Sequence, residues 1–302
     1  MRAVGEETRV SVITERPIIP SEAAEAVGAD ASFACAPERD VVYAERLEGG
    51  IEVVYLNQPR KKNALSGEMM TKLDVLPRVY PYVKKLDALL RAADVDDGVR
   101  VVVLRGAGDD FSSGGDLDQG PALEPGPEGA RKTLRRYLAV VRTIRTMSKP
   151  VVAMVDGYAV GGAFALVCAS DLVCASERAL FVPAFCQIGI VPEMGMMKLL
   201  PDLVGPQRAK ELLFFGGKIP ALQLYDWGVV NRVFPTETLE ADTLWFARQL
   251  AGMPDASIHL TKNIMNALAD GNLEACLEAE STASPFCTTT KAYAATMEKF
   301  AR

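Results

Sequence analysis

Two glycine-rich turns contain backbone groups that could hold a negatively charged oxygen. The first lies in residues 105–117 (RGAGDDFSSGGDL) and the second in residues 156–164 (DGYAVGGAF), and each follows an apolar run. Glycine leaves backbone N–H groups accessible, so two such turns side by side can direct two donors at one oxygen, which is an oxyanion hole. Neither turn fits a nucleotide signature, because Phe111 stands where GxGxxG needs its last glycine. The alternative is that both are plain turns between strands and helices.

Side chains for other common mechanisms are scarce. His259 is the only histidine, so a histidine triad or a His-rich metal site has almost nothing to build on. Ser112 and Ser113 therefore lack a base that would make them nucleophiles. The six cysteines never form a CxxC pair, which favours buried thiols in a reducing compartment. We expect no metal site and no separate cofactor.

Charge and hydropathy exclude several classes of partner. The 302 residues carry 33 lysines and arginines against 39 aspartates and glutamates, a net charge of −6 without a concentrated basic stretch, which argues against nucleic acid. No apolar run is long enough to span a membrane. Residues 1–40 mix acids with arginines and lack the apolar region of a secretory signal, so we expect a loosely ordered extension on a cytoplasmic protein.

The elements that must position the glycine turns alternate between strand and helix, which predicts an α/β core over residues 41–235 followed by a helical region over 236–302. Gly49 and Gly50 mark a tight hairpin turn, because glycine accepts the positive φ that such a turn needs. Strands are expected at 41–47, 51–56, 101–104, 150–155, 172–175 and 179–181, and helices at 66–76, 83–93, 130–147 and 162–169.

Four segments, taken in order, resemble motifs of the crotonase, or enoyl-CoA hydratase/isomerase, superfamily. Residues 56–65 (LNQPRKKNAL) are similar to the family's LNRPxxxNAL segment, and residues 111–117 (FSSGGDL) to its FxxGxD[IL] turn. Residues 149–162 (KPVVAMVDGYAVGG) are similar to its KPVIAAVxGxAxGGG segment, and residues 221–234 (ALQLYDWGVVNRVF) to its AxxxGLVxxV helix and strand. The resemblance covers residues 41–302.

This resemblance implies a crotonase/ClpP-like spiral of ββα units, with C-terminal helices that build a homotrimer or a hexamer of two trimers. It implies an acyl-CoA thioester as substrate, so that coenzyme A enters as part of the substrate. The family's oxyanion-hole N–H groups correspond to those of Gly115 and Gly162. The residues implied to contact CoA or the acyl group are Arg60, Lys61, Lys62, Ala64, Ser113, Asp116, Leu117, Tyr158 and Lys262.

Three of these residues also have plainer interpretations. Asp116 can hydrogen-bond within its own turn, as aspartate commonly does. Tyr158 can pack instead of reaching a substrate oxygen. Lys262 can be a solvated lysine on a helix, and His259 on the same helix is expected at the surface or in packing.

The family's catalytic carboxylates decide which reaction the resemblance implies. Its hydratases use two glutamates, and those positions hold Ala165 and Phe185, neither of which transfers a proton. Glu193 falls where the single-glutamate Δ3,Δ2-enoyl-CoA isomerases have their base. One carboxylate suffices for a double-bond shift, because it can remove a proton from C2 and return it at C4. Met194 then stands where the family pattern has glycine.

The favoured interpretation is therefore an isomerase that converts 3-enoyl-CoA to 2-enoyl-CoA with Glu193 as proton shuttle. Apolar neighbours, if they line its pocket, would raise the pKa of Glu193. Alternatively, Glu193 is simply an acid at a helix start, after Pro192. Another crotonase reaction (hydrolysis, C–C cleavage, decarboxylation or hydration) and a non-catalytic CoA-binding protein stay open. We also expect a kinked helix near 74–85 beside the acyl group and a lid at 119–129.

Overall fold

A computed structural model of the chain describes residues 40–65, 81–116 and 126–269, together with separate positions between 273 and 298. The predictions for the N-terminal extension and for the helix at 66–76 lie outside the described residues. So do most of the segments 74–85 and 119–129.

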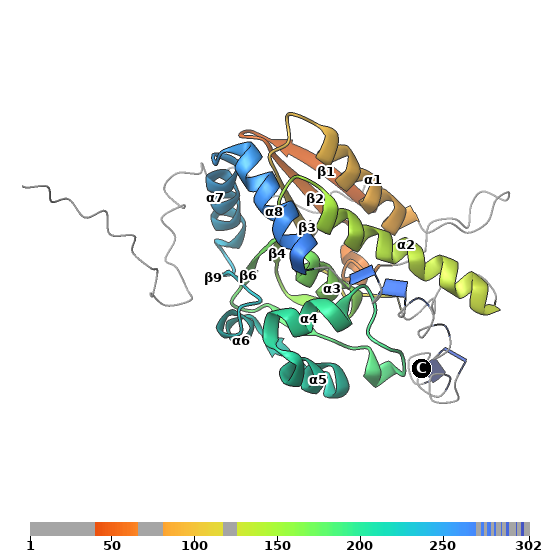
Figure 1. Cartoon of the computed structure of the whole chain (residues 1–302). Helices are drawn as coiled ribbons and strands as arrows, with labels where there is room; N and C mark the ends of the chain where they lie inside the picture. The colour runs from red at the N-terminus through yellow and green to blue at the C-terminus, as the bar shows by residue number, and fades with distance from the viewer. Residues whose placement is uncertain are drawn as a thin grey trace, which may run out of the picture.

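A six-stranded sheet forms the centre of the molecule (Figure 1), with the strand order β1-β2-β3-β4-β6-β9. β1 pairs antiparallel with β2, and every later pair in the sheet is parallel. Gly49 and Gly50 have φ values of 81° and 78°, which confirms the predicted hairpin turn. The strands are β1 (Val42–Leu47), β2 (Ile51–Leu56), β3 (Val101–Gly106), β4 (Val151–Val155), β6 (Leu172–Ser176) and β9 (Arg232–Phe234).

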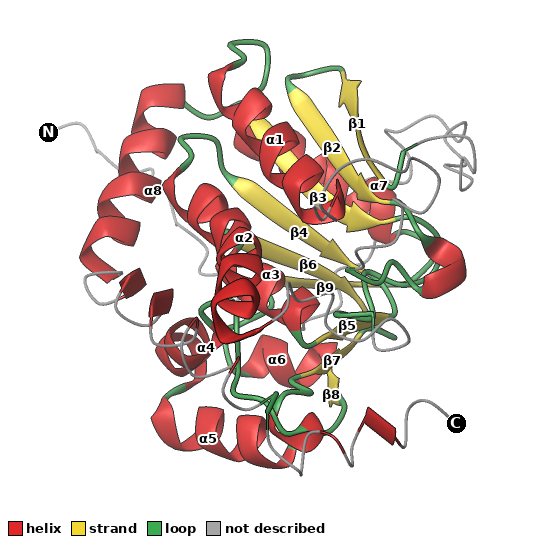
Figure 2. Cartoon of the chain, turned by 90° about the vertical axis from the view of Figure 1, so that its right-hand side faces the viewer, coloured by secondary structure: helices red, strands yellow, loops and turns green. Residues whose placement is uncertain are grey.

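Both faces of this sheet are buried, as its continuous apolar runs predict. Because successive side chains of a strand point to opposite faces, Val102 packs with the helices on one face and Val103 with α7 on the other. Figure 2 shows this layering, with α1 and α2 in front of the sheet and α7 behind it. The covering helices are α1 (Pro81–Val95), α2 (Gly126–Thr146), α3 (Gly162–Ala169) and α7 (Leu239–Ala251).

A smaller sheet lies at the carboxyl end of the parallel strands and carries the second glycine turn. It contains β5 (Tyr158–Val160), β7 (Leu180–Val182) and β8 (Ile219–Pro220), with β5 parallel and β8 antiparallel to β7. The remaining helices are α4 (Met196–Val204), α5 (Pro206–Phe215), α6 (Ala221–Asp226) and α8 (Asp255–Ala269), with single 3-10 turns at Pro59–Lys61 and Cys186–Ile188. The predicted α/β class is confirmed. None of the helices in the described part of the chain has the length and apolar character needed to cross a membrane.

Candidate active site

Backbone hydrogen bonds hold the two glycine turns side by side. The N–H of Ser112 donates to the Tyr158 carbonyl at 2.8 Å, and the N–H of Val160 donates to the Ser112 carbonyl at 3.0 Å. On the other side of the first turn, the N–H of Leu65 donates to the Gly114 carbonyl at 2.7 Å. Three extended segments far apart in the sequence therefore run as neighbours and end at one place.

The two predicted oxyanion donors, Gly115 and Gly162, both lie next to Leu65. Leu65 pairs with Gly115 in a parallel bridge, and its Cδ1 lies 3.5 Å from the point where a Cβ on Gly162 would stand. Gly162 is the first residue of α3, so its N–H has no acceptor within the helix. Within the described residues neither N–H donates a hydrogen bond. Two donors without an acceptor, one of them at a helix N-terminus, are what the predicted oxyanion hole requires.

The glycines that precede the donors both adopt positive φ, and Gly114 also approaches the second turn closely. Gly114 has φ of 79°, and a Cβ there would stand 2.4 Å from the Val160 carbonyl oxygen. Gly161 has φ of 54°, also in the region that disfavours other residues. In each pair, the first glycine (Gly114 or Gly161) adopts the positive φ of the turn, and the second (Gly115 or Gly162) is the predicted donor.

Apolar side chains surround the second turn, including the two positions where hydratase carboxylates were considered. Ala165 is fully buried, and Phe185 is buried with its Cζ 3.9 Å from the point where a Cβ on Gly161 would stand. Met194 is also buried, and its Sδ lies 2.9 Å from the equivalent point on Gly162. Gly161 and Gly162 themselves are therefore bordered by Phe185 and Met194, whose side chains carry no ionisable group.

Glu193 is half-buried in the segment that leads into α4. Its carbonyl accepts the N–H of Met196 at 3.1 Å, which fixes the backbone at the helix start. The next residue, Met194, contacts Gly162 with its thioether. The predicted base, Glu193, is thus the sequence neighbour of Met194, whose side chain lies against Gly162.

The predicted CoA-contacting residues separate into two groups. In the first, Lys61 Nζ lies 3.1 Å from Asp116 Oδ2, and the Ser113 hydroxyl donates to the Lys61 carbonyl at 3.2 Å. Ala64, which is close to Lys61 in the sequence, is buried. Leu117 lies outside the described residues. This group stiffens the loop before Leu65, and the Asp116 ion pair goes beyond the plain turn bond considered for that residue.

The second group lines a pocket of about 590 Å³. Arg60, Lys62 and Tyr158 are among its lining residues, and the Lys62 ammonium lies 4.8 Å from the centre of the Tyr158 ring. Lys218 donates to the Tyr158 hydroxyl at 2.9 Å, so a further cation lies beside the pocket. No motif signals Lys218, because it reaches Tyr158 only through the pairing of β8 with β7 and of β7 with β5.

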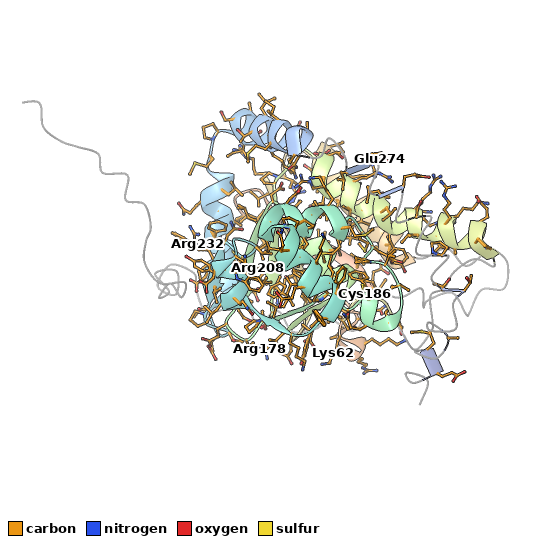
Figure 3. The ribbon with its side chains drawn as sticks, turned by 60° about the horizontal axis from the view of Figure 1, so that its bottom comes forward. Lys62, Arg178, Cys186, Arg208, Arg232 and Glu274 are labelled. Atoms are coloured by element: carbon orange, nitrogen blue, oxygen red, sulfur yellow. The ribbon has the colours of Figure 1, made fainter. Side chains whose placement is uncertain are left out.

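Arg178, which also lines the pocket, connects the two glycine turns. Its guanidinium donates to Asp156 Oδ1 at 2.8 Å and Oδ2 at 2.7 Å, and to the Asp109 carbonyl at 3.2 Å. These hydrogen bonds to Asp156 raise the pKa of Arg178. Figure 3 shows Arg178 and Lys62 along the same edge of the molecule. No motif in the sequence signals Arg178, because its contacts depend on the order of strands in the sheet.

Lys262 is buried and paired within the chain. Its Nζ is buried, lies 2.7 Å from Asp171 Oδ2 and donates to the Lys149 carbonyl at 2.8 Å. Burial lowers the pKa of Lys262, while the Asp171 carboxylate acts in the opposite direction. This geometry corrects the alternative of a solvated lysine, because the side chain ties α8 to the loop before β4. The CoA contact of Lys262 stays a prediction.

Of the three cysteines within the described residues, two are buried and Cys186 is half-buried. Cys168 and Cys174 are buried, and burial raises the pKa of Cys174 to about 12, so a reactive thiolate does not form there. Among the residues that the structure describes, no three His, Cys, Asp or Glu side chains gather as metal ligands.

The chain is similar to proteins of one family over most of its length. The family model for enoyl-CoA hydratase/isomerase matches residues 46–301. A 4-chlorobenzoyl coenzyme A dehalogenase-1 from Arthrobacter sp is 36% identical over 234 residues, which are 76% of this chain and 80% of the relative. Enoyl-CoA delta isomerase 2 from Rattus norvegicus is 33% identical over 78% of this chain and 57% of its own length. The crystal structure of an enoyl-CoA hydratase from Mycobacterium avium subsp. paratuberculosis K-10 matches with a TM-score of 0.75 at 27% identity, covering 86% of this chain and 95% of that one.

Proposed function

The chain belongs to the enoyl-CoA hydratase/isomerase family, with a crotonase fold and an acyl-CoA substrate, and we propose that it is a double-bond isomerase. The proposed reaction converts a 3-enoyl-CoA to the conjugated 2-enoyl-CoA. One observation carries this proposal: Glu193 directly precedes Met194, whose thioether lies against Gly162, while the positions of the two hydratase carboxylates hold the buried apolar residues Ala165 and Phe185.

The proposed mechanism needs the oxyanion hole and one base. The thioester oxygen accepts hydrogen bonds from the N–H groups of Gly115 and Gly162, which lowers the energy of an enolate. The Glu193 carboxylate removes a proton from C2, and the electron pair moves onto the thioester oxygen. The carboxylic acid then returns the proton at C4 as the double bond moves to C2–C3, so that base and substrate end in balance.

Hydration is a weaker proposal because it requires two proton-transferring groups. Adding water to a 2-enoyl thioester requires a base for the water and an acid for the α-carbon. Ala165 and Phe185 supply neither, and the Phe185 ring fills space beside Gly161.

We also propose that the pocket of about 590 Å³ receives the phosphate end of CoA. Arg60 and Lys62 line it and Lys218 borders it, which gives an anionic group several cationic partners. Arg60 is exposed and forms no ion pair within the described residues, so its guanidinium is available to a phosphate.

The test of the proposed reaction follows ultraviolet absorbance of the conjugated thioester after a 3-enoyl-CoA is mixed with the protein. We expect turnover by the wild type, and a loss of kcat of at least about 100-fold in Glu193→Gln with binding retained. Glu211→Gln, an exposed acid on α5, is the matched control and should keep full activity. Crotonyl-CoA with water measures hydration in the same assay.

Two results would contradict the isomerase. Equal turnover by Glu193→Gln would remove this carboxylate from the mechanism. Tight acyl-CoA binding without any 3-enoyl turnover would favour a different acyl-CoA reaction or a binding protein.

A further inference from the structure

We propose that Met194 selects acyl groups without a branch at the carbon next to the thioester, because its side chain fills the space beside the oxyanion hole. The inference rests on the proposed binding of a thioester oxygen at Gly115 and Gly162. It does not depend on which reaction follows, because it concerns the shape of the bound acyl group.

The backbone of Met194 is held in an unusual conformation. Its φ is 57°, in the left-handed region where a residue with a side chain is strained. Only Lys62 and Asn63 share this feature among the described residues other than glycine. Gly195 follows, also with positive φ, and α4 begins directly afterwards. A bulky residue kept in a strained turn beside a site indicates a constraint that belongs to the site.

This conformation directs the Met194 side chain at the oxyanion hole. Its Sδ lies 2.9 Å from the point where a Cβ on Gly162 would stand, and the side chain is buried. The Cβ at that point and the amide nitrogen of Gly162 would both be bonded to the same Cα. The thioether therefore borders the space that a carbonyl group on this N–H would occupy.

Two further apolar side chains complete the border. Leu65 Cδ1 lies 3.5 Å from the same point on Gly162, and Phe185 lies against Gly161. Since Leu65, Phe185 and Met194 come from three different segments, the surroundings of the carbonyl are fixed by tertiary packing. A flat acyl group with only hydrogens on C2 fits between such walls. A methyl branch on C2 would compete with the Met194 thioether for one place.

The test compares the dissociation constants of two saturated thioesters, butyryl-CoA and isobutyryl-CoA, by calorimetry. These ligands have the same number of carbons and differ in the branch at C2. We expect the wild type to prefer butyryl-CoA by about tenfold, which is the discrimination that one methyl group commonly gives in a closed apolar site. In Met194→Gly we expect this preference to fall to about twofold or less, through tighter binding of isobutyryl-CoA.

Two variants control for side-chain bulk and for sequence position. Met194→Leu keeps the bulk without the sulfur and should keep the wild-type preference. Met197→Ala removes a methionine that is 37% exposed on α4, and should also leave it unchanged. A folded Met194→Gly protein with the wild-type preference would overturn the inference. Because saturated thioesters measure binding alone, loss of the isomerase proposal would leave this result intact, whereas failure of both thioesters to bind the wild type would overturn both.

Discussion

The thioether of Met194 lies against Gly162, with its sulfur 2.9 Å from the point where a Cβ on that glycine would stand. The two residues meet because Met194 adopts φ of 57° immediately before the turn into α4. A strained residue thus supplies one wall of the predicted oxyanion hole. Local strain at a site has to be offset by the packing around it, and Met194 is buried among core residues.

The strain gives a measurable difference between two truncations of Met194. Both Met194→Ala and Met194→Gly lose the packing of the thioether, but only glycine accepts a positive φ without penalty. We expect Met194→Gly to be more stable than Met194→Ala by about 1 kcal/mol in urea unfolding. Alanine in a helix or strand normally stabilises relative to glycine, so a higher stability of Met194→Ala would show that the left-handed conformation does not hold in solution.

The first glycine turn offers a matched pair of neighbouring substitutions. A Cβ on Gly114 would stand 2.4 Å from the Val160 carbonyl oxygen, while a Cβ on Gly115 would meet nothing within 4 Å. We expect Gly114→Ala to cost at least about 2 kcal/mol of unfolding free energy, because it combines a clash with backbone strain at φ of 79°. Gly115→Ala should stay within about 0.5 kcal/mol of the wild type. Equal losses in the two variants would contradict the described turn.

Much of the fold follows from local patterns. The runs at 101–104 and 150–155 are apolar at every position, and they form central parallel strands buried on both faces. The hairpin follows from Gly49 and Gly50. These features are set by neighbouring residues, so a single sequence contains the information.

The contacts that complete the site depend instead on strand order and burial. Arg178 follows β6 and contacts Asp156, which follows the neighbouring strand β4. Lys218 contacts Tyr158 because β7 pairs with both β5 and β8. No spacing in the sequence signals either contact. The sequence pattern around Lys262 is that of a lysine on a helix surface, but α8 packs on the loop before β4 and buries its side chain. The expected homotrimer or hexamer and the boundaries of the helical C-terminal region stay predictions.

The proposed CoA pocket predicts a specific effect of Arg60. Arg60→Ala should raise the KM for an acyl-CoA by about tenfold with little change in kcat, because it removes binding energy that substrate and transition state share. The same variant should leave the KM of an acyl-pantetheine, which lacks the nucleotide, unchanged. The effect should shrink at high ionic strength, since salt screens an exposed cation. Lys84→Ala on α1, also exposed, serves as control, and a matching KM rise there would show a general charge effect.

The position of Lys262 predicts a change in stability without a change in CoA binding. Lys262→Met leaves Asp171 without its ammonium partner, and breaking such a buried pair typically costs about 3 kcal/mol in unfolding free energy. Changing Asp171 to Asn in the same chain should recover part of this loss, because the unpaired charge is removed. The KM for acyl-CoA should stay within about twofold of the wild type at a temperature where the variant is folded. A KM rise without loss of stability would contradict this expectation and support the predicted CoA contact.

The surroundings of His259 predict how the free energy of unfolding depends on pH. The effect is simple to measure because His259 is the only histidine in the sequence. Burial lowers its pKa below the ordinary 6.5, while Asp255, with Oδ1 3.0 Å from Nε2, raises it. Between the folded pKa and about 6.5 the unfolded chain therefore binds more protons, so stability rises with pH in that window and falls as the solution is acidified through it. NMR titration of the single imidazole should give a pKa below 6.5, and a still lower one in Asp255→Asn. In His259→Gln this component of the pH dependence should disappear, and a wild-type imidazole that titrates above 6.5 would show that Asp255 outweighs burial.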